Sequence, residues 1–154
     1  MRKKSPMVFF QEMKMNPHNL PIPLSKMVEH LGYTVYSLNK QDAPPHFAGA
    51  VDYSRKAIFV NDADCYYRQR FTIAHEIAHI VLHKKPAFID YRTEDEQGCN
   101  KESEANSFAA ELLMPAEVFY EQWKINFGSL PILSKLFAVS EDAIYYRAKN
   151  LGLL

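Results

Sequence analysis

The chain of 154 residues is 47% hydrophobic and 23% charged, which is the balance of a globular domain and excludes a disordered chain. Its eighteen basic and eighteen acidic residues cancel, which argues against a uniformly basic, nucleic-acid-binding surface. Two cysteines are too few for a disulfide scaffold, and no apolar run is long enough for a membrane helix or a signal peptide. We therefore expect one soluble, cytoplasmic domain over residues 1–154.

The first half of the chain predicts strands after an irregular start. Closely spaced prolines interrupt residues 1–22, so no long element is expected there. A short amphipathic helix is predicted at 23–31, ended by a glycine. Aromatic and β-branched residues indicate a strand at 33–38, and two further strands at 47–53 and 56–61 are expected to form a hairpin.

The second half of the chain predicts helices. A long, mostly apolar helix covers about 65–83, and a second strong helix covers 102–114 and ends at Pro115. The polar stretch between them, 84–101, is expected to be a surface loop. Three shorter helices are predicted after them, at 115–124, 132–138 and 141–149. Early strands followed by late helices indicate a small α+β fold, with a three-stranded sheet packed on the first long helix.

The helix at 65–83 carries a motif with a known chemistry. From His75 to His79 the sequence reads His-Glu-x-x-His, which places two imidazoles one helical turn apart, as zinc-binding proteases do. On a helical wheel both histidines and Glu76 share a polar stripe with Thr72 and His83, and the other positions are apolar. Such a helix is expected to be buried, and buried polar groups are costly unless they are paired or bind a metal. The alternative is a core helix with one solvated edge, where Lys and Glu would be more usual than three His.

The second strong helix offers a third metal ligand. Glu102 lies on the apolar face of helix 102–114, where a carboxylate needs a cationic partner. Glu104 and Glu111 point to the opposite side, where water is expected. Asn106 lies one turn beyond Glu102 on the same face, where it can hydrogen-bond a ligating histidine. Alternatively, Glu102 only interacts with the positive end of the helix dipole.

These two segments together resemble the ImmA/IrrE family of zinc metallopeptidases. The resemblance covers about residues 58–115 and rests on the run Arg70–His79 and on the pattern Glu-x-x-Ala-Asn that begins at Glu102. This pattern is similar to the third-ligand pattern of gluzincins, which usually ends in Asp; Asn106 would make that contact uncharged and the His ligands slightly less basic. The resemblance extends to residues 130–154, which look like the helix-turn-helix-like tail of the family.

The resemblance implies a small zincin-like fold and a cytoplasmic endopeptidase that depends on Zn²⁺. Such enzymes are often linked to phages or mobile elements and cleave a helix-turn-helix repressor. In this chain His75, His79 and Glu102 would hold the metal, with Asn106 supporting a histidine ligand. Glu76 would take a proton from the attacking water and pass it to the leaving amine.

Three details of this chemistry stay open at the level of sequence. The group that stabilises the oxyanion could be any of several polar side chains near the motif: Tyr66, Tyr67, Arg70 or His83. Since His83 is about 12 Å of helix rise from His75, we expect it outside the ligand set, in a structural or substrate-contacting role. The strand at 48–53 is either a sheet edge to which a substrate peptide adds or an ordinary hairpin core.

Three functions are compatible with these patterns. The first is a zinc endopeptidase that acts on a protein partner, such as a helix-turn-helix repressor or an antitoxin-like regulator. The second is a non-catalytic regulator whose structural zinc site docks a repressor or DNA; the third, compatible with the first, is the toxin or regulator half of a two-gene module. Glu76 favours the first, because a structural site needs no general base. Residues 132–149 hold few Lys and Arg, so we expect them to dock a protein or pack on the domain, and no sequence-specific DNA binding.

Overall fold

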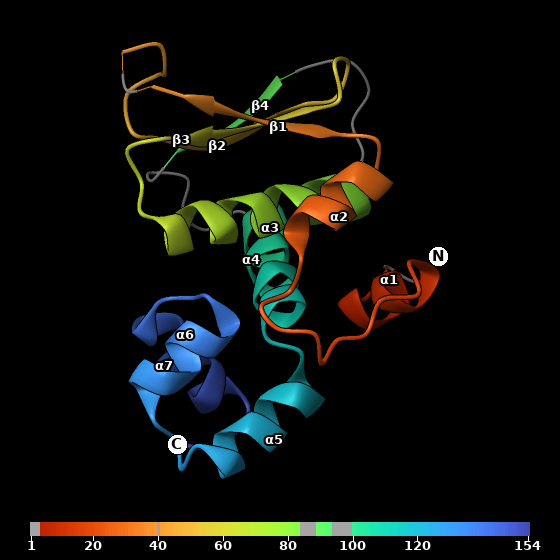
Figure 1. Ribbon diagram of the computed structural model, residues 1–154. Helices are drawn as coiled ribbons and strands as arrows, with labels where there is room; N and C mark the ends of the chain where they lie inside the picture. Colours follow the sequence, from red (N-terminus) through yellow and green to blue (C-terminus); the bar gives the residue numbers. More distant parts are fainter. Residues whose placement is uncertain (1–3, 40, 84–88, 94–99) are drawn as a thin grey trace.

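The computed structural model describes residues 4–39, 41–83, 89–93 and 100–154. These residues form the following helices and strands in chain order: α1 (Pro6–Glu12), α2 (Leu24–His30), β1 (Thr34–Leu38), β2 (Phe47–Asp52), β3 (Ala57–Asn61), α3 (Tyr66–Leu82), β4 (Ile89–Thr93), α4 (Asn100–Leu113), α5 (Ala116–Ile125), α6 (Leu130–Phe137) and α7 (Glu141–Asn150). Figure 1 shows the sheet on one side of α3 and α4 on the other, with α5, α6 and α7 beyond the far end of α4. The expected small α+β fold is confirmed. Within the described residues, no helix is long and apolar enough to cross a membrane.

The sheet has the strand order β1-β3-β2-β4. The predicted hairpin is present, with β2 antiparallel to β3, and β1 runs parallel to β3 on the outer side. β4 pairs antiparallel with the other side of β2, so the backbone of β2 is hydrogen-bonded on both sides. All six residues of β2 are buried. The edge-strand interpretation of residues 48–53 is therefore wrong, and the hairpin-core interpretation is correct.

The fourth strand lies in the stretch that was expected to be a surface loop. β4 has the sequence Ile-Asp-Tyr-Arg-Thr, which alternates strand-favouring and charged residues, but this run is short and lies within a polar, acidic stretch. Pairing with β2 supplies the backbone hydrogen bonds of this strand. The remainder of the expected loop, 84–88 and 94–99, lies outside the described residues.

The N-terminal segment 1–22, expected to be irregular, contains the helix α1. Ser5 caps this helix, and its hydroxyl accepts a hydrogen bond from the amide of Val8. Pro6 occupies the first turn, where no amide donor is needed, so this proline begins a helix and does not break one. Phe9 and Phe10 on the inner face of α1 are buried in the core, which gives the short helix its tertiary support.

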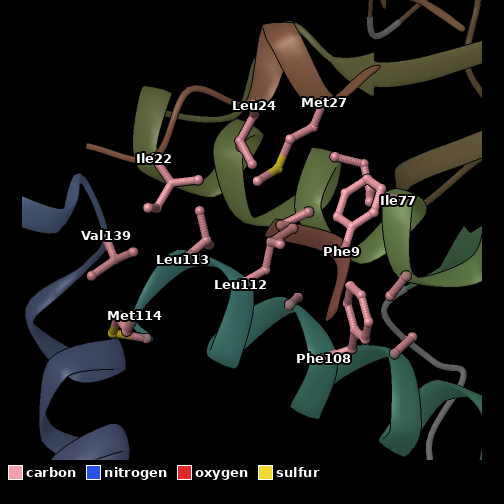
Figure 2. Close-up of a cluster of buried hydrophobic side chains, with 14 of the residues drawn as sticks. Phe9, Ile22, Leu24, Met27, Ile77, Phe108, Leu112, Leu113, Met114 and Val139 are labelled. Carbon is pink, nitrogen blue, oxygen red and sulfur yellow. The ribbon is translucent and has the colours of Figure 1, made fainter. Parts of the chain in front are cut away.

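A core of apolar side chains joins α3 and α4 to the helices around them. Figure 2 shows Ile77 of α3, Phe108 and Leu112 of α4, Phe9 of α1 and Met27 of α2 in one cluster. Burying each such side chain contributes roughly 1.5–3 kcal/mol to stability. α3 is thus enclosed by the sheet on one side and α4 on the other, as its nearly continuous apolar surface predicted.

The C-terminal helices pack on the end of this core. Ser140 caps α7 through a hydrogen bond that its hydroxyl accepts from the amide of Ala143. Leu133 and Phe137 of α6 are fully buried, and Nε of Arg147 donates to the backbone oxygen of Met114 at the end of α4. Helices α6 and α7 therefore contribute to the hydrophobic core. This is one of the two roles expected for residues 132–149, namely packing on the domain.

Candidate metal centre

The polar stripe of α3 is buried, as the sequence predicted. His75, Glu76 and His79 are 0%, 1% and 3% exposed, at the middle of a helix covered by β2 and β3 and by α4. Three ionisable side chains at such depth require partners, since burial of an uncompensated charge is costly. The first turn of α4 crosses this part of α3 and supplies Glu102 as a partner for the two histidines.

Two histidines and one glutamate converge at this crossing. Nε2 of His75 and Nε2 of His79 are 3.0 Å apart. Oε2 of Glu102 lies 2.9 Å from Nε2 of His75, and Oε1 lies 2.8 Å from Nε2 of His79. All ligand atoms of the three side chains are within 4.8 Å of one another. Two imidazole nitrogens and a carboxylate are the donor set of many catalytic zinc sites, so these residues fit a divalent metal.

The charge of Glu102 is balanced by these histidines. Burial raises the pKa of the Glu102 carboxyl, but hydrogen bonds and charge interactions with His75 and His79 outweigh it and hold that pKa well below its usual range. The carboxylate is thus kept ionised although its side chain is only 16% exposed. An ionised carboxylate aimed at two ring nitrogens is what a metal ligand requires.

Asn106 lies where the sequence placed it, beside the first histidine. Nδ1 of His75 and Oδ1 of Asn106 are 2.8 Å apart. An amide oxygen only accepts, so Nδ1 of His75 donates, and Nε2 is the nitrogen whose lone pair can bind a metal once its own proton is lost. The contact is uncharged, as expected from Asn in this position.

His83 lies outside the three-residue cluster, as expected, but Glu104 does not face water alone. Nδ1 of His83 lies 3.1 Å from Nδ1 of His79, and Nε2 of His83 lies 2.9 Å from Oε2 of Glu104. The helical wheel of α4 considered that helix by itself, whereas two sides of its first turn contact α3. The expectation that Glu104 points only to solvent is therefore wrong.

Glu76 lies beneath the glycine of a neighbouring strand. A Cβ atom built on Gly49 of β2 would overlap the methyl group of Thr72 and lie 2.9 Å from Oε1 of Glu76. Only glycine therefore allows β2 to approach α3 this closely. Sequence reasoning missed Gly49, although a glycine inside a predicted strand is a known sign of close backbone approach.

The side chains considered for the oxyanion do not join the cluster. Arg70 is buried and donates from Nη2 to the backbone oxygen of Ile22 at 2.9 Å, so it ties α3 to the segment before α2. Tyr66 and Tyr67 lie in the first turn of α3, about 12 Å or more of helix rise before His75. The fourth, His83, contacts His79 and Glu104 instead.

Most of the chain matches a known protein family. The family model Peptidase_M78, described as the IrrE N-terminal-like domain, matches residues 28–149. The fold is similar to that of a Mycobacterium tuberculosis transcriptional regulator, with a TM-score of 0.63 and 18% identity over 92% of this chain and 45% of that chain. The chain thus spans less than half of that regulator, and at this identity the likeness concerns the fold alone. No curated protein matches the chain significantly.

Proposed function

Because the chain belongs to the Peptidase_M78 family, by its IrrE N-terminal-like domain, we propose that it is a zinc-dependent endopeptidase. Its substrate is a protein partner, a helix-turn-helix transcriptional regulator, in which it hydrolyses one peptide bond. The structural neighbour is a transcriptional regulator, which supports a regulatory setting for this fold.

The observation that carries the proposal is the position of Glu76. It lies on the same buried stripe as His75 and His79, yet the metal ligands are complete without it, since Glu102 supplies the carboxylate. A site that only held a structural metal would gain nothing from a second buried carboxylate beside it, and would bear the cost of burying it. A general base for hydrolysis gives this carboxylate a role.

The division of tasks among these residues follows from their positions. His75, His79 and Glu102 hold the zinc, which when bound supplies the Lewis acidity for amide hydrolysis near neutral pH. Asn106 fixes the ring of His75 so that Nε2 faces the metal. Glu76 accepts a proton from the attacking water and donates it to the nitrogen of the leaving amine.

The test compares Glu76→Gln with the parent chain. Glutamine is close in size to glutamate and cannot take up the proton, so we expect unchanged zinc content and fold and a loss of cleavage of at least about 100-fold. The matched control is Glu29→Gln, the same chemical change at an exposed position on α2, which is expected to cleave normally.

The candidate substrates in this experiment are helix-turn-helix regulators from the same genome, each co-expressed with each variant. Mass spectrometry of each regulator, with and without a chelator, reports any metal-dependent cleavage. Cleavage by Glu76→Gln at the parent rate would refute the general-base role. Tight binding of the regulator by the parent chain, with no cleavage, would favour a non-catalytic regulator with a structural zinc site.

A further inference from the structure

The end of α3 turns a third histidine back toward the metal centre. His83 directly follows the last residue of α3 and caps the helix, and its backbone has left the helical conformation, with φ −127° and ψ 35°. Its amide still donates to the oxygen of His79 at 2.8 Å, and the two rings lie 5.3 Å apart between centroids. The side chain of His83 is only 7% exposed, so its ring is held against its neighbours.

The contacts of this ring form a chain from the metal centre to α4. Nδ1 of His79 meets Nδ1 of His83 at 3.1 Å, and Nε2 of His83 meets Oε2 of Glu104 at 2.9 Å. A histidine that binds a metal through Nε2 carries its proton on Nδ1, so His79 must donate to His83. His83 then carries its own proton on Nε2 and donates it to the carboxylate. A single arrangement of protons satisfies every link.

We infer that His83 and Glu104 are positioning residues that orient His79 for the metal. This inference rests on the proposed function in so far as it assumes a zinc ion held by His75, His79 and Glu102. The hydrogen bond from His79 fixes the rotation of its ring, and Glu104 fixes the tautomer of His83 that can accept this bond. Outer contacts of this kind typically change metal affinity by about 10–100-fold.

The two histidine ligands are thus supported in different ways. His75 donates to the uncharged amide of Asn106, whereas His79 is linked through His83 to a carboxylate. A carboxylate behind a ligating imidazole increases its basicity, which an amide does much less. Asn106 brings no negative charge to His75. Glu104 supplies such a charge on the other side of the site, where it reaches His79 through the ring of His83.

Zinc affinity, measured by competition with a chromophoric chelator, tests this inference without a substrate. In His83→Leu and Glu104→Ala the chain of hydrogen bonds is cut, and we expect zinc to bind about 10–100-fold more weakly. His83→Asn places an amide oxygen near the position of Nδ1, so it can still accept from His79 but loses the link to Glu104, and its affinity should fall between those of the parent and His83→Leu. Glu104→Gln keeps an acceptor and loses the charge, so its affinity should fall between those of the parent and Glu104→Ala. Glu111→Ala, an exposed glutamate on the same helix, is the control and should bind zinc as the parent does.

Two further measurements separate positioning from a purely structural contact. Thermal unfolding in the presence of a chelator reports the stability of the metal-free fold, which the Asn and Gln variants should leave near that of the parent. Long-range ¹⁵N–¹H spectra of the zinc-loaded parent should place the proton of His83 on Nε2. Parent-like zinc affinity in both His83→Leu and Glu104→Ala, or a proton on Nδ1 of His83, would overturn the inference. Failure of the proposed function would look different, because the parent chain itself would then bind no zinc or cleave no regulator.

Discussion

Replacing Gly49 by alanine is expected to disturb the base of the proposed reaction while leaving the metal ligands in place. The new methyl group would overlap the Thr72 methyl group and lie 2.9 Å from Oε1 of Glu76, whereas its contact with the backbone oxygen of Phe59, at 3.5 Å, is ordinary. Thr72 and Glu76 are each 1% exposed, so neither can move out into solvent. The strain must therefore be taken up by a shift of β2 against α3 or by displacement of the carboxylate.

The size of the effect follows from the tightness of this contact. Overpacking a buried site by one methyl group typically costs about 1–3 kcal/mol, which we expect as the loss of unfolding free energy in Gly49→Ala. A displacement of a catalytic group by a large fraction of an ångström can lower turnover by on the order of 100-fold. We expect kcat to fall by about 10–100-fold and zinc content to stay at the parent value, because the new methyl group meets Glu76 and not the three ligands.

The double variant Gly49→Ala with Thr72→Ser separates the two contacts. Serine lacks the methyl group that the new Cβ overlaps, so the double variant should recover part of the lost stability in a double-mutant cycle. The contact with Glu76 remains, so turnover should stay low. Gly152→Ala is the control: its Cβ would meet nothing within 4 Å, but its φ is +77°, so it should cost about 1 kcal/mol through backbone strain alone and keep full activity.

Three measurements test this prediction. Denaturant unfolding gives the stability, metal analysis gives the zinc content, and steady-state kinetics give kcat separately from KM. Parent-like stability and turnover in Gly49→Ala would show that β2 does not press on Glu76 as closely as described. Recovery of turnover in parallel with stability in the double variant would show that Thr72, and not the carboxylate, is the sensitive contact.

Two further predictions concern the tail and the sheet. Truncation after Ser129 removes Leu133 and Phe137 from the core, so we expect the truncated chain to unfold at a markedly lower denaturant concentration. Neither the truncated nor the full chain should bind a DNA duplex tightly and in a salt-sensitive manner. Such binding by the full chain would contradict our interpretation of α6 and α7. In the turn between β2 and β3, the hydroxyl of Ser54 and two backbone amides outweigh the effect of burial and lower the pKa of Asp52. The stability that Asp52 contributes is therefore complete above its unfolded pKa of about 3.9 and is lost as the pH falls through its lower folded value. Asp52→Asn should unfold with a shallower pH dependence below about pH 4, and an unchanged acid limb would refute this.

The sequence predicted which polar residues gather on α3 and α4 better than it predicted the sheet that covers them. Helical periodicity over 65–83 was strong enough to place His75, Glu76 and His79 on one face, because a buried helix tolerates few polar positions. Glu102 could be selected for the same reason, since it was a carboxylate on an apolar face. In both cases the information lay within one helix, where spacing alone fixes direction.

The features that sequence reasoning missed depend on contacts between elements. The alternation in β4 is short and lies within a polar stretch, so the strand becomes evident only from its pairing with β2. The order β1-β3-β2-β4 places β2 inside the sheet, which no property of residues 48–53 could have shown. Glu104 was assigned to solvent because a wheel for one helix does not show that another helix crosses it. Pro6 was interpreted as a breaker, whereas its position after Ser5 makes it a helix start.

The two halves of the proposed chemistry are supported by different parts of the fold. The metal side of the stripe on α3 meets the first two turns of α4, where Glu102, Glu104 and Asn106 make their contacts. The base side meets β2, where the missing side chain of Gly49 leaves room for Glu76. Since α4 and β2 approach α3 from different directions, a change in one can leave the other in place. Substitutions in the first turn of α4 should therefore alter zinc affinity first, and those at Gly49 should alter turnover first. If the buried stripe combines a metal centre with a general base, the loss of zinc affinity and the loss of turnover should be separable in this way. A purely structural zinc site offers no reason for a loss of turnover that leaves zinc binding intact.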